Sequence, residues 1–415
     1  MTLADLLHGV PVAQLDGPTN LPVLHLAYDS RRVQPGTVFC TWAGTLHDGH
    51  RFIPDALQRG APAIVAETPC PTPGATRVLV PSGRRALARM AANLYRHPSR
   101  HLKVLGVTGT NGKTSVAWIT RQLLQTLGTP TGLLGTVAYD LGQGPQPASH
   151  TTPEGLDLQA ALATMRDHGC QAAAIEVSSH ALAQGRTDAT HFHAAAFTNL
   201  TQDHLDFHRT MEAYFHAKSL LFTSLAPGAI APINIDCPYG RHLFTLLPDG
   251  VLPIACGTAP DADLRIDNLH TTAAGSTFTL HAHGTAHPCH TRLLGHFNAN
   301  NITLALALAS SLGHPLSRLT SLLPSVQPVP GRLETVPSSA PFTVVIDYAH
   351  TPDAVTQTLR VLRPLASGQL LAILGCGGDR DRSKRPLMAR AALDLAHRCI
   401  FTSDNPRSED PLAIL

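Results

Sequence analysis

The stretch Gly106-Val-Thr-Gly-Thr-Asn-Gly-Lys-Thr-Ser115 decides the fold of this chain. The segment before it, Leu102–Thr108, is predicted to be a buried strand, and the segment after it, Ser115–Leu127, is predicted to be an amphipathic helix. A glycine-rich loop in that position can wrap a polyphosphate, because its N–H groups and the helix N-terminus attract the anion. Lys113 adds a full positive charge, and the hydroxyl of Thr114 is placed to bind Mg²⁺.

The spacing of this loop is unusual. Five residues separate Gly106 from Gly112, whereas an ordinary P-loop has four between its first glycine and its Gly-Lys pair. The alternative interpretation is a turn rich in glycine and threonine that binds nothing. A lysine followed by the hydroxyls of Thr114 and Ser115, between a strand and a helix, favours a phosphate-binding loop. The sequence therefore points to a protein that uses a nucleoside triphosphate.

Length and composition predict a multidomain globular protein. The chain has 415 residues, which is too long for one hydrophobic core and suggests roughly two to four domains. Its net charge of +2 comes from 31 basic and 29 acidic residues that are evenly spread, so nucleic acid is not an expected partner. The eight cysteines are scattered without a C-x-x-C pair, as in a reduced, cytoplasmic protein. We expect neither a signal peptide nor a membrane span, and we expect a monomer.

Strand and helix patterns divide the chain into three predicted domains. Residues 1–100 carry short strands and turns, residues 101–331 alternate buried strands with helices, and residues 332–415 repeat a β-α-β-α-β pattern. The fold class is α/β, with a central P-loop domain built on a mainly parallel sheet. The C-terminal domain is predicted to be Rossmann-like and incomplete, because the pattern stops at Leu415 without a closing strand. Four histidines, His281, His283, His287 and His290, fall in alternating sequence that predicts a solvated hairpin and not a metal site.

Polar side chains follow the predicted central strands. Glu176 ends the strand Ala172–Val177, and Asp203 and His204 follow the strand Ala194–Thr198. Lys218 lies in the next helical segment. Taken singly, each has an ordinary structural explanation, as a helix cap, a loop residue or a solvated helix residue. Because ligands collect at the carboxyl ends of parallel strands, their shared placement predicts a metal–nucleotide site beside the loop.

Several motifs together resemble the Mur ligase family, ATP-dependent enzymes that form amide bonds in peptidoglycan synthesis. They are Thr108-Gly-Thr-Asn-Gly-Lys-Thr114, Glu176-Val-Ser-Ser-His180, Asp203-His-Leu-Asp206 and Asp347-Tyr-Ala-His-Thr-Pro-Asp353. The resemblance covers nearly the whole chain and implies a three-domain ligase of the cytoplasm, active in cell wall biogenesis and so in cell shape, division and the cell cycle. It is strongest to members that add a diamino acid to UDP-N-acetylmuramoyl-L-Ala-D-Glu. In that reaction the D-glutamyl γ-carboxylate attacks ATP, and an amine then attacks the acyl phosphate.

The resemblance also implies roles for individual residues at the nucleotide. Lys113, Glu176, His204 and Lys218 would be catalytic. Mg²⁺ would be held by Thr114, Glu176, His204 and Lys218, the lysine as a carbamate. ATP would contact Gly109, Thr110, Asn111, Gly112, Lys113, Thr114, Ser115, Asn298, Asn301, Arg332 and Asp347.

The other substrates would be bound on either side of the nucleotide. The UDP-muramoyl dipeptide would contact Tyr28, Ser30, Thr45, Leu46, His47, Thr151, Thr152, Ser178, Gln184 and Arg186. His150 departs from the family pattern, which has asparagine there. The amino acid would contact Arg380, Asp404, Asn405, Pro406 and Arg407. The Asp-Asn-Pro-Arg tetrad accompanies meso-diaminopimelate in the family, and a guanidinium suits the distal carboxylate that lysine lacks.

Alternatives remain open at this point. Family members continue beyond the position of Leu415, so the sequence predicts a C-terminally truncated ligase. An L-lysine-adding ligase and an inactive nucleotide-sugar-binding remnant are the alternatives within the family. A folylpolyglutamate synthase would lack the Asp29-Ser-Arg and Asp404-Asn-Pro-Arg segments, and a regulatory GTPase would need an Asn-Lys-x-Asp motif that the sequence does not contain.

Overall fold

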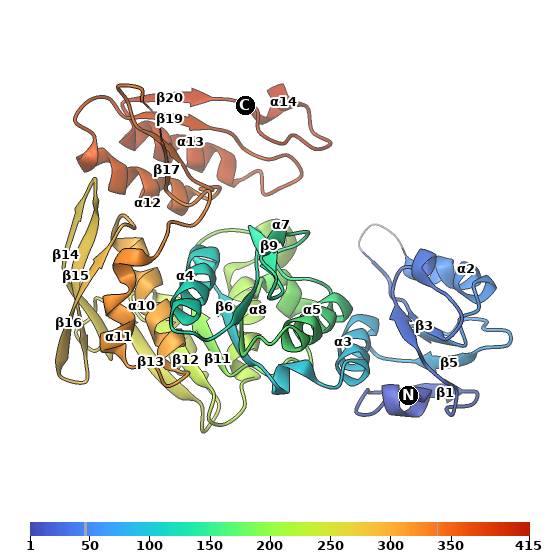
Figure 1. The fold of residues 1–415 in the computed structure, drawn as a ribbon. Helices are drawn as coiled ribbons and strands as arrows, with labels where there is room; N and C mark the ends of the chain where they lie inside the picture. Colours follow the sequence, from blue (N-terminus) through green and yellow to red (C-terminus); the bar gives the residue numbers. More distant parts are fainter. Residues whose placement is uncertain (45–47, 338) are drawn as a thin grey trace.

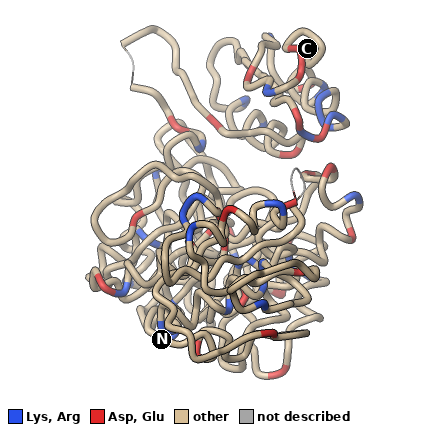
Figure 2. Tube along the Cα trace, turned by 90° about the vertical axis from the view of Figure 1, so that its right-hand side faces the viewer, with Lys and Arg blue, Asp and Glu red and all other residues tan. Residues whose placement is uncertain are grey.

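The protein is described by a computed structural model that covers residues 1–44, 48–337 and 339–415. Three groups of elements follow one another along the chain and lie in a row that bends at the C-terminal group (Figure 1). We call them the N-terminal unit (α1 to α3), the central unit (β6 to α11) and the C-terminal unit (β17 to α14). Among the described residues no helix is long and apolar enough to cross a membrane. Lysines and arginines are interspersed with acidic residues along the trace (Figure 2).

The central unit is built on a sheet of 11 strands in the order β16-β15-β14-β13-β12-β11-β6-β10-β7-β8-β9. The strands from β13 to β7 in that order are parallel, as predicted for alternating strands and helices. The strands are β6 (Lys103–Thr108), β7 (Thr131–Leu134), β8 (Ala138–Asp140), β9 (Pro145–Pro147), β10 (Ala172–Glu176), β11 (Ala194–Phe197), β12 (Ile230–Asn234), β13 (Leu252–Gly257), β14 (Leu264–Thr272), β15 (Gly275–Ala282) and β16 (Thr285–Thr291). The antiparallel pair β15–β16 carries His281, His287 and His290, and His283 lies in the turn between the strands, which confirms the predicted hairpin.

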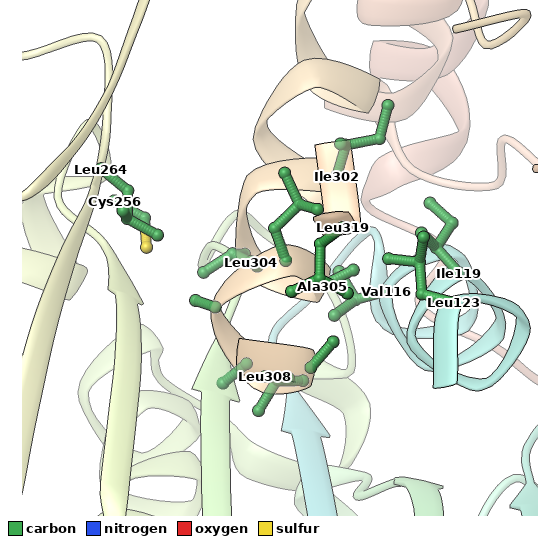
Figure 3. Close-up of a cluster of buried hydrophobic side chains, with 14 of the residues drawn as sticks. Val116, Ile119, Leu123, Cys256, Leu264, Ile302, Leu304, Ala305, Leu308 and Leu319 are labelled. Atoms are coloured by element: carbon green, nitrogen blue, oxygen red, sulfur yellow. The ribbon is translucent and has the colours of Figure 1, made fainter. Parts of the chain in front are cut away.

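Helices cover both faces of this sheet because its central strands are apolar on both sides. They are α4 (Lys113–Thr126), α5 (Gly155–Asp167), α6 (Ser179–Ala183), α7 (Leu205–His208), α8 (Met211–Thr223), α9 (Pro238–Phe244), α10 (His296–Ser310) and α11 (Leu316–Ser321). Helices α4 and α10 pack together over one face, where Val116, Ile119 and Leu123 meet Ile302 and Ala305 (Figure 3). This packing fixes the start of α4, and with it the glycine-rich loop.

The N-terminal unit has a five-stranded sheet in the order β1-β5-β4-β3-β2. Only β1 is antiparallel to its neighbour. The elements are α1 (Leu3–Leu6), β1 (Gln14–Asp16), β2 (His25–Ala27), β3 (Thr37–Cys40), α2 (Ile53–Gln58), β4 (Ala63–Ala66), β5 (Thr76–Leu79) and α3 (Gly83–Leu94). Helix α3 packs against α5, so it joins this unit to the central one.

The C-terminal unit contains an antiparallel pair, β17 with β18, and a parallel pair, β19 with β20. Its elements are β17 (Glu334–Val336), β18 (Val344–Ile346), α12 (Pro352–Leu362), β19 (Leu371–Leu374), α13 (Lys384–Leu395), β20 (Arg398–Phe401) and α14 (Pro411–Ile414). The predicted β-α-β-α-β order is present, but in the described residues the two pairs are separate sheets. Helices α12 and α13 pack together, whereas Ile346 and Ile373 on the strands and Phe342 before β18 stay half exposed or more.

Candidate functional site

The glycine-rich loop lies between β6 and α4, as the sequence predicted. Gly109 and Gly112 have φ angles of +145° and +88°, a region that side chains other than glycine rarely adopt. A Cβ on Gly112 would also lie 2.4 Å from Oδ1 of Asn301. Nζ of Lys113 folds back and donates to the carbonyls of Gly109 and Thr110, at 2.9 and 2.8 Å. The loop is therefore held in a cradle shape by its own lysine.

Glu176 is the acidic centre of the site. Its side chain is 1% exposed and accepts hydrogen bonds from the Thr114 hydroxyl at 3.0 Å and from the backbone N–H and hydroxyl of Thr136 at 2.7 and 3.1 Å. Arg332 donates to the same Thr114 hydroxyl at 3.0 Å. Mg²⁺ prefers oxygen ligands and keeps several waters or phosphate oxygens, so a buried carboxylate beside a hydroxyl fits this ion.

Lys218 comes from α8 and reaches the same loop. Its Nζ donates to the Gly109 carbonyl at 2.7 Å, which is also an acceptor for Lys113. The ammonium lies 4.5 Å from the centre of the Tyr214 ring. Burial, reinforced by the nearby charge of Lys113, lowers the pKa of Lys218 well below its usual value. A lower pKa increases the fraction of neutral amine, which is the form that reacts with CO₂.

His204 and Asp203 lie together after β11. His204 adopts a left-handed backbone with φ +53°, and its Nε2 lies 3.3 Å from Oδ2 of Asp203. Burial lowers the pKa of His204 to about 3, so the imidazole is neutral and has a lone pair available. The ring of His180 meets it edge-on at 4.9 Å. In the described residues no group of three or more His, Cys, Asp and Glu side chains is arranged to hold a metal.

The remaining nucleotide candidates surround the loop. Asn298 and Asn301 are buried in the first turns of α10, with Asn301 against Gly112. Asp347 accepts the backbone N–H of Leu333 at 2.7 Å, next to Arg332. Burial raises the pKa of Asp347. The structure thus brings together candidates from four distant parts of the sequence.

The candidates for the muramoyl dipeptide form a second cluster next to Glu176. The Thr152 hydroxyl donates to the Glu176 carbonyl at 2.8 Å and accepts the N–H of Ser178 at 3.0 Å. Arg186 donates to the Thr152 carbonyl at 3.0 Å and to Oε1 of Gln184 at 2.9 Å. The Thr151 hydroxyl lies 3.0 Å from that of Thr136. Arg186 also forms an ion pair with Glu154 at 3.1 Å.

The N-terminal candidates lie farther away. Tyr28 donates its hydroxyl hydrogen to Asp157 of α5 at 2.6 Å, so this side chain ties the N-terminal unit to the central one. Its ring stacks on Trp42 at 6.0 Å. Ser30 is buried at the start of a short 3₁₀ helix. The candidates Thr45, Leu46 and His47 lie outside the described residues.

The amino-acid candidates meet in the C-terminal unit. The loops Gly377–Arg380 and Asp404–Arg407 touch so closely that a Cβ on Gly378 would lie 1.8 Å from the Pro406 carbonyl oxygen. Arg407 donates to the Gly378 carbonyl at 2.6 Å. Arg380, at the tip of its loop, donates to the neighbouring Asp379 carbonyl at 2.9 Å. The two candidate arginines therefore belong to two loops that are in direct contact.

Sequence reasoning missed several contacts of the site. Thr136 was not predicted, although its place just after β7 gave the same strand-end signal as Glu176. Glu154, which fixes Arg186, follows the predicted threonine pair closely. Lys384, which forms an ion pair with Asp203 at 2.9 Å, gave no signal, because only the docking of the C-terminal unit brings it there.

The chain matches three family descriptions: the Mur ligase catalytic domain over residues 22–95, the Mur ligase middle domain over 107–309 and the Mur ligase glutamate ligase domain over 331–415. It is 43% identical to the UDP-N-acetylmuramoyl-L-alanyl-D-glutamate–2,6-diaminopimelate ligase of Geobacillus kaustophilus, covering 100% of this chain and 86% of the relative. The enzyme of that name from Geobacter sulfurreducens is also 43% identical, with 100% and 82% covered. A solved structure of such a ligase is 34% identical, with a TM-score of 0.77 over 100% of this chain and 84% of that one.

Proposed function

This chain belongs to the Mur ligase family, and we propose that it joins meso-diaminopimelate to the D-glutamyl γ-carboxylate of UDP-N-acetylmuramoyl-L-Ala-D-Glu with hydrolysis of ATP. The single observation that carries the proposal is the convergence of Lys113, Thr114, Glu176 and Lys218 at the end of one parallel sheet, in a chain that is 43% identical to ligases of that name. We further propose that the protein acts as a cytoplasmic monomer.

The first chemical step is phosphoryl transfer to a carboxylate. The γ-carboxylate oxygen attacks the γ-phosphorus of ATP, the bond from that phosphorus to the bridging oxygen breaks, and ADP leaves while an acyl phosphate forms. Both reactants are anionic, so positive groups must hold them in line. Lys113 leaves its loop carbonyls to contact the phosphates, and Arg332 lies beside Thr114. Mg²⁺ held by Thr114 and Glu176, and a second Mg²⁺ held by His204 and by Lys218 as a carbamate, would neutralise further phosphate charge.

The second step forms the amide bond. The neutral amine of diaminopimelate attacks the acyl carbon, inorganic phosphate leaves, and the amine loses a proton. Water must be kept from the acyl phosphate during this step. The C-terminal unit suits that task, since Asn111 of the loop donates to Asp353 of that unit at 3.1 Å. The same unit carries Arg407, whose guanidinium can bind the distal carboxylate of diaminopimelate bidentately.

Phosphate release from ATP tests the function. The assay combines UDP-N-acetylmuramoyl-L-Ala-D-Glu with either meso-diaminopimelate or L-lysine. We expect turnover with diaminopimelate only. Turnover with lysine alone would refute the specificity, and no turnover with either amine, alongside binding of the muramoyl dipeptide, would support an inactive nucleotide-sugar-binding protein.

The Arg407→Ala variant tests the assigned specificity contact. Loss of a charge-assisted pair should raise the KM for diaminopimelate on the order of 100-fold, while ATP affinity is unchanged. Arg398→Ala, at the outer strand β20 of the same unit, serves as the matched control. An equal fall in ATP affinity would show that Arg407 does not act on the amino acid.

A further inference from the structure

Lysine is rare in this chain, and most of its lysines lie at or next to the nucleotide site. Lys103, Lys113, Lys218 and Lys384 are the only lysines among 31 basic residues, so arginine is the usual cation of this protein. Lys113 and Lys218 belong to the nucleotide site, and Lys384 is joined to it through Asp203. The lysine side chain ends in a compact ammonium group, whereas arginine ends in a planar guanidinium group. Lys384 differs from the other two because it comes from the C-terminal unit.

Lys384 forms a buried ion pair between two units. It is the first residue of α13 and is 8% exposed, and Asp203 follows β11 and is 2% exposed. Nζ of Lys384 donates to Oδ1 of Asp203 at 2.9 Å. Next to this pair, Gln202 donates to Ser383 at 3.3 Å, so the two segments touch through successive residues.

Asp203 connects this pair to the nucleotide site. Its Oδ1 also accepts the backbone N–H of His204 at 2.9 Å, and its Oδ2 lies 3.3 Å from the imidazole of His204 and 3.6 Å from that of His350. One carboxylate is thus shared by the His204 segment and by two parts of the C-terminal unit.

We propose that Lys384 is a positioning residue that holds the C-terminal unit closed against the loop after β11 and, through Asp203, fixes the backbone turn and the ring of His204. A buried ion pair is strongly destabilised when one partner is removed, because the other charge stays buried without compensation. Loss of Lys384 therefore favours separation of the two units, because water can then solvate the carboxylate of Asp203. The consequence for catalysis rests on the proposed function, whereas the closing contact itself does not.

Trypsin cleavage after Arg332 measures separation of the units directly. The side chain of Arg332 is bound to Thr114 in the closed protein, and Leu333 is 6% exposed. In the ligand-free chain, K384M should increase the rate of this cleavage about tenfold or more, because the unpaired charge costs more than the ~1.4 kcal/mol that corresponds to tenfold. K384R keeps the charge and should remain within about twofold of the wild type. K103M changes an exposed lysine and should leave the rate unchanged.

Small-angle scattering separates this role from a merely structural one. A structural lysine would lower the melting temperature without changing the radius of gyration, whereas loss of the closing contact increases that radius. Wild-type cleavage and radius in K384M, or equal effects of K384M and K384R, would overturn the proposal. If circular dichroism shows that K384M does not fold, the cleavage rate and radius of gyration of D203N are measured in its place. An increase in both supports the proposal, and wild-type values overturn it. Neither measurement needs a substrate, so failure here is distinct from failure of the ligase assay.

Discussion

The Tyr28→Phe variant isolates the hydrogen bond that joins the N-terminal and central units. Tyr28 donates to Oδ2 of Asp157 at 2.6 Å, and burial together with this carboxylate raises the pKa of the phenol. Phenylalanine keeps the ring that stacks on Trp42 and removes only the hydroxyl. Any effect therefore reports on the hydrogen bond and not on lost packing.

The expected loss of stability follows from the type of hydrogen bond that Tyr28 makes. A hydrogen bond to a charged group contributes about 1.5–3 kcal/mol, and the lower end applies because both side chains are only partly buried. We expect the free energy of unfolding of the N-terminal unit to fall by about 1.5 kcal/mol, a little more than a factor of ten in its folding equilibrium. D157N should cause a similar loss, and the two changes together should cost little more than either one.

The protein provides its own fluorescent probe for this experiment. Trp42 and Trp118 are its two tryptophans, so W118F leaves Trp42 as a reporter beside Tyr28. Urea unfolding followed at Trp42 gives the midpoint for each variant. Tyr95→Phe, which alters another half-buried tyrosine of the same unit, is the matched control. An unchanged midpoint in Y28F, or full additivity with D157N, would refute the assigned role of this contact.

Further predictions concern stability, metal binding and pH. Arg121→Met leaves its buried ion-pair partner Asp140 uncompensated and should reduce the free energy of unfolding by about 3 kcal/mol; an unchanged urea midpoint would contradict this. Glu176→Gln should lower phosphate release on the order of 100-fold with an unchanged circular dichroism spectrum, and activity within tenfold of the wild type would exclude it as a Mg²⁺ ligand. Hydrogen bonds from Arg385 lower the pKa of Glu409 to about 2 from a usual 4.5. The stabilisation from this contact is therefore complete above pH 4.5 and is lost as the pH falls toward 2. Amide hydrogen exchange near Glu409 should increase over that pH range, and a flat profile would refute the prediction.

The central fold could be predicted because its signals are local. A buried strand, a glycine-rich turn and an amphipathic helix each leave a pattern within a few residues, and β6 and α4 are found where those patterns predicted. Parallel strands bring their carboxyl ends together, so Glu176 at the end of one strand and His204 in the loop after another were expected at one edge of the sheet. The Tyr28–Asp157 and Asp203–Lys384 contacts could not be predicted, because they depend on how separately folded units dock. The same reason explains why Tyr28, expected only as a contact of the UDP-muramoyl dipeptide, is hydrogen-bonded to Asp157 between two units.

One carbonyl oxygen of the glycine-rich loop accepts hydrogen bonds from two lysines, so Lys113 and Lys218 compete for the same acceptor. Lys113 and Lys218 both donate to Gly109, and the charge of Lys113 adds to burial in lowering the pKa of Lys218. An entering polyphosphate would offer Lys113 an anionic acceptor and leave the Gly109 carbonyl to Lys218. Nucleotide binding would then be an exchange of hydrogen-bond partners within the loop, after which the two lysines no longer share one acceptor.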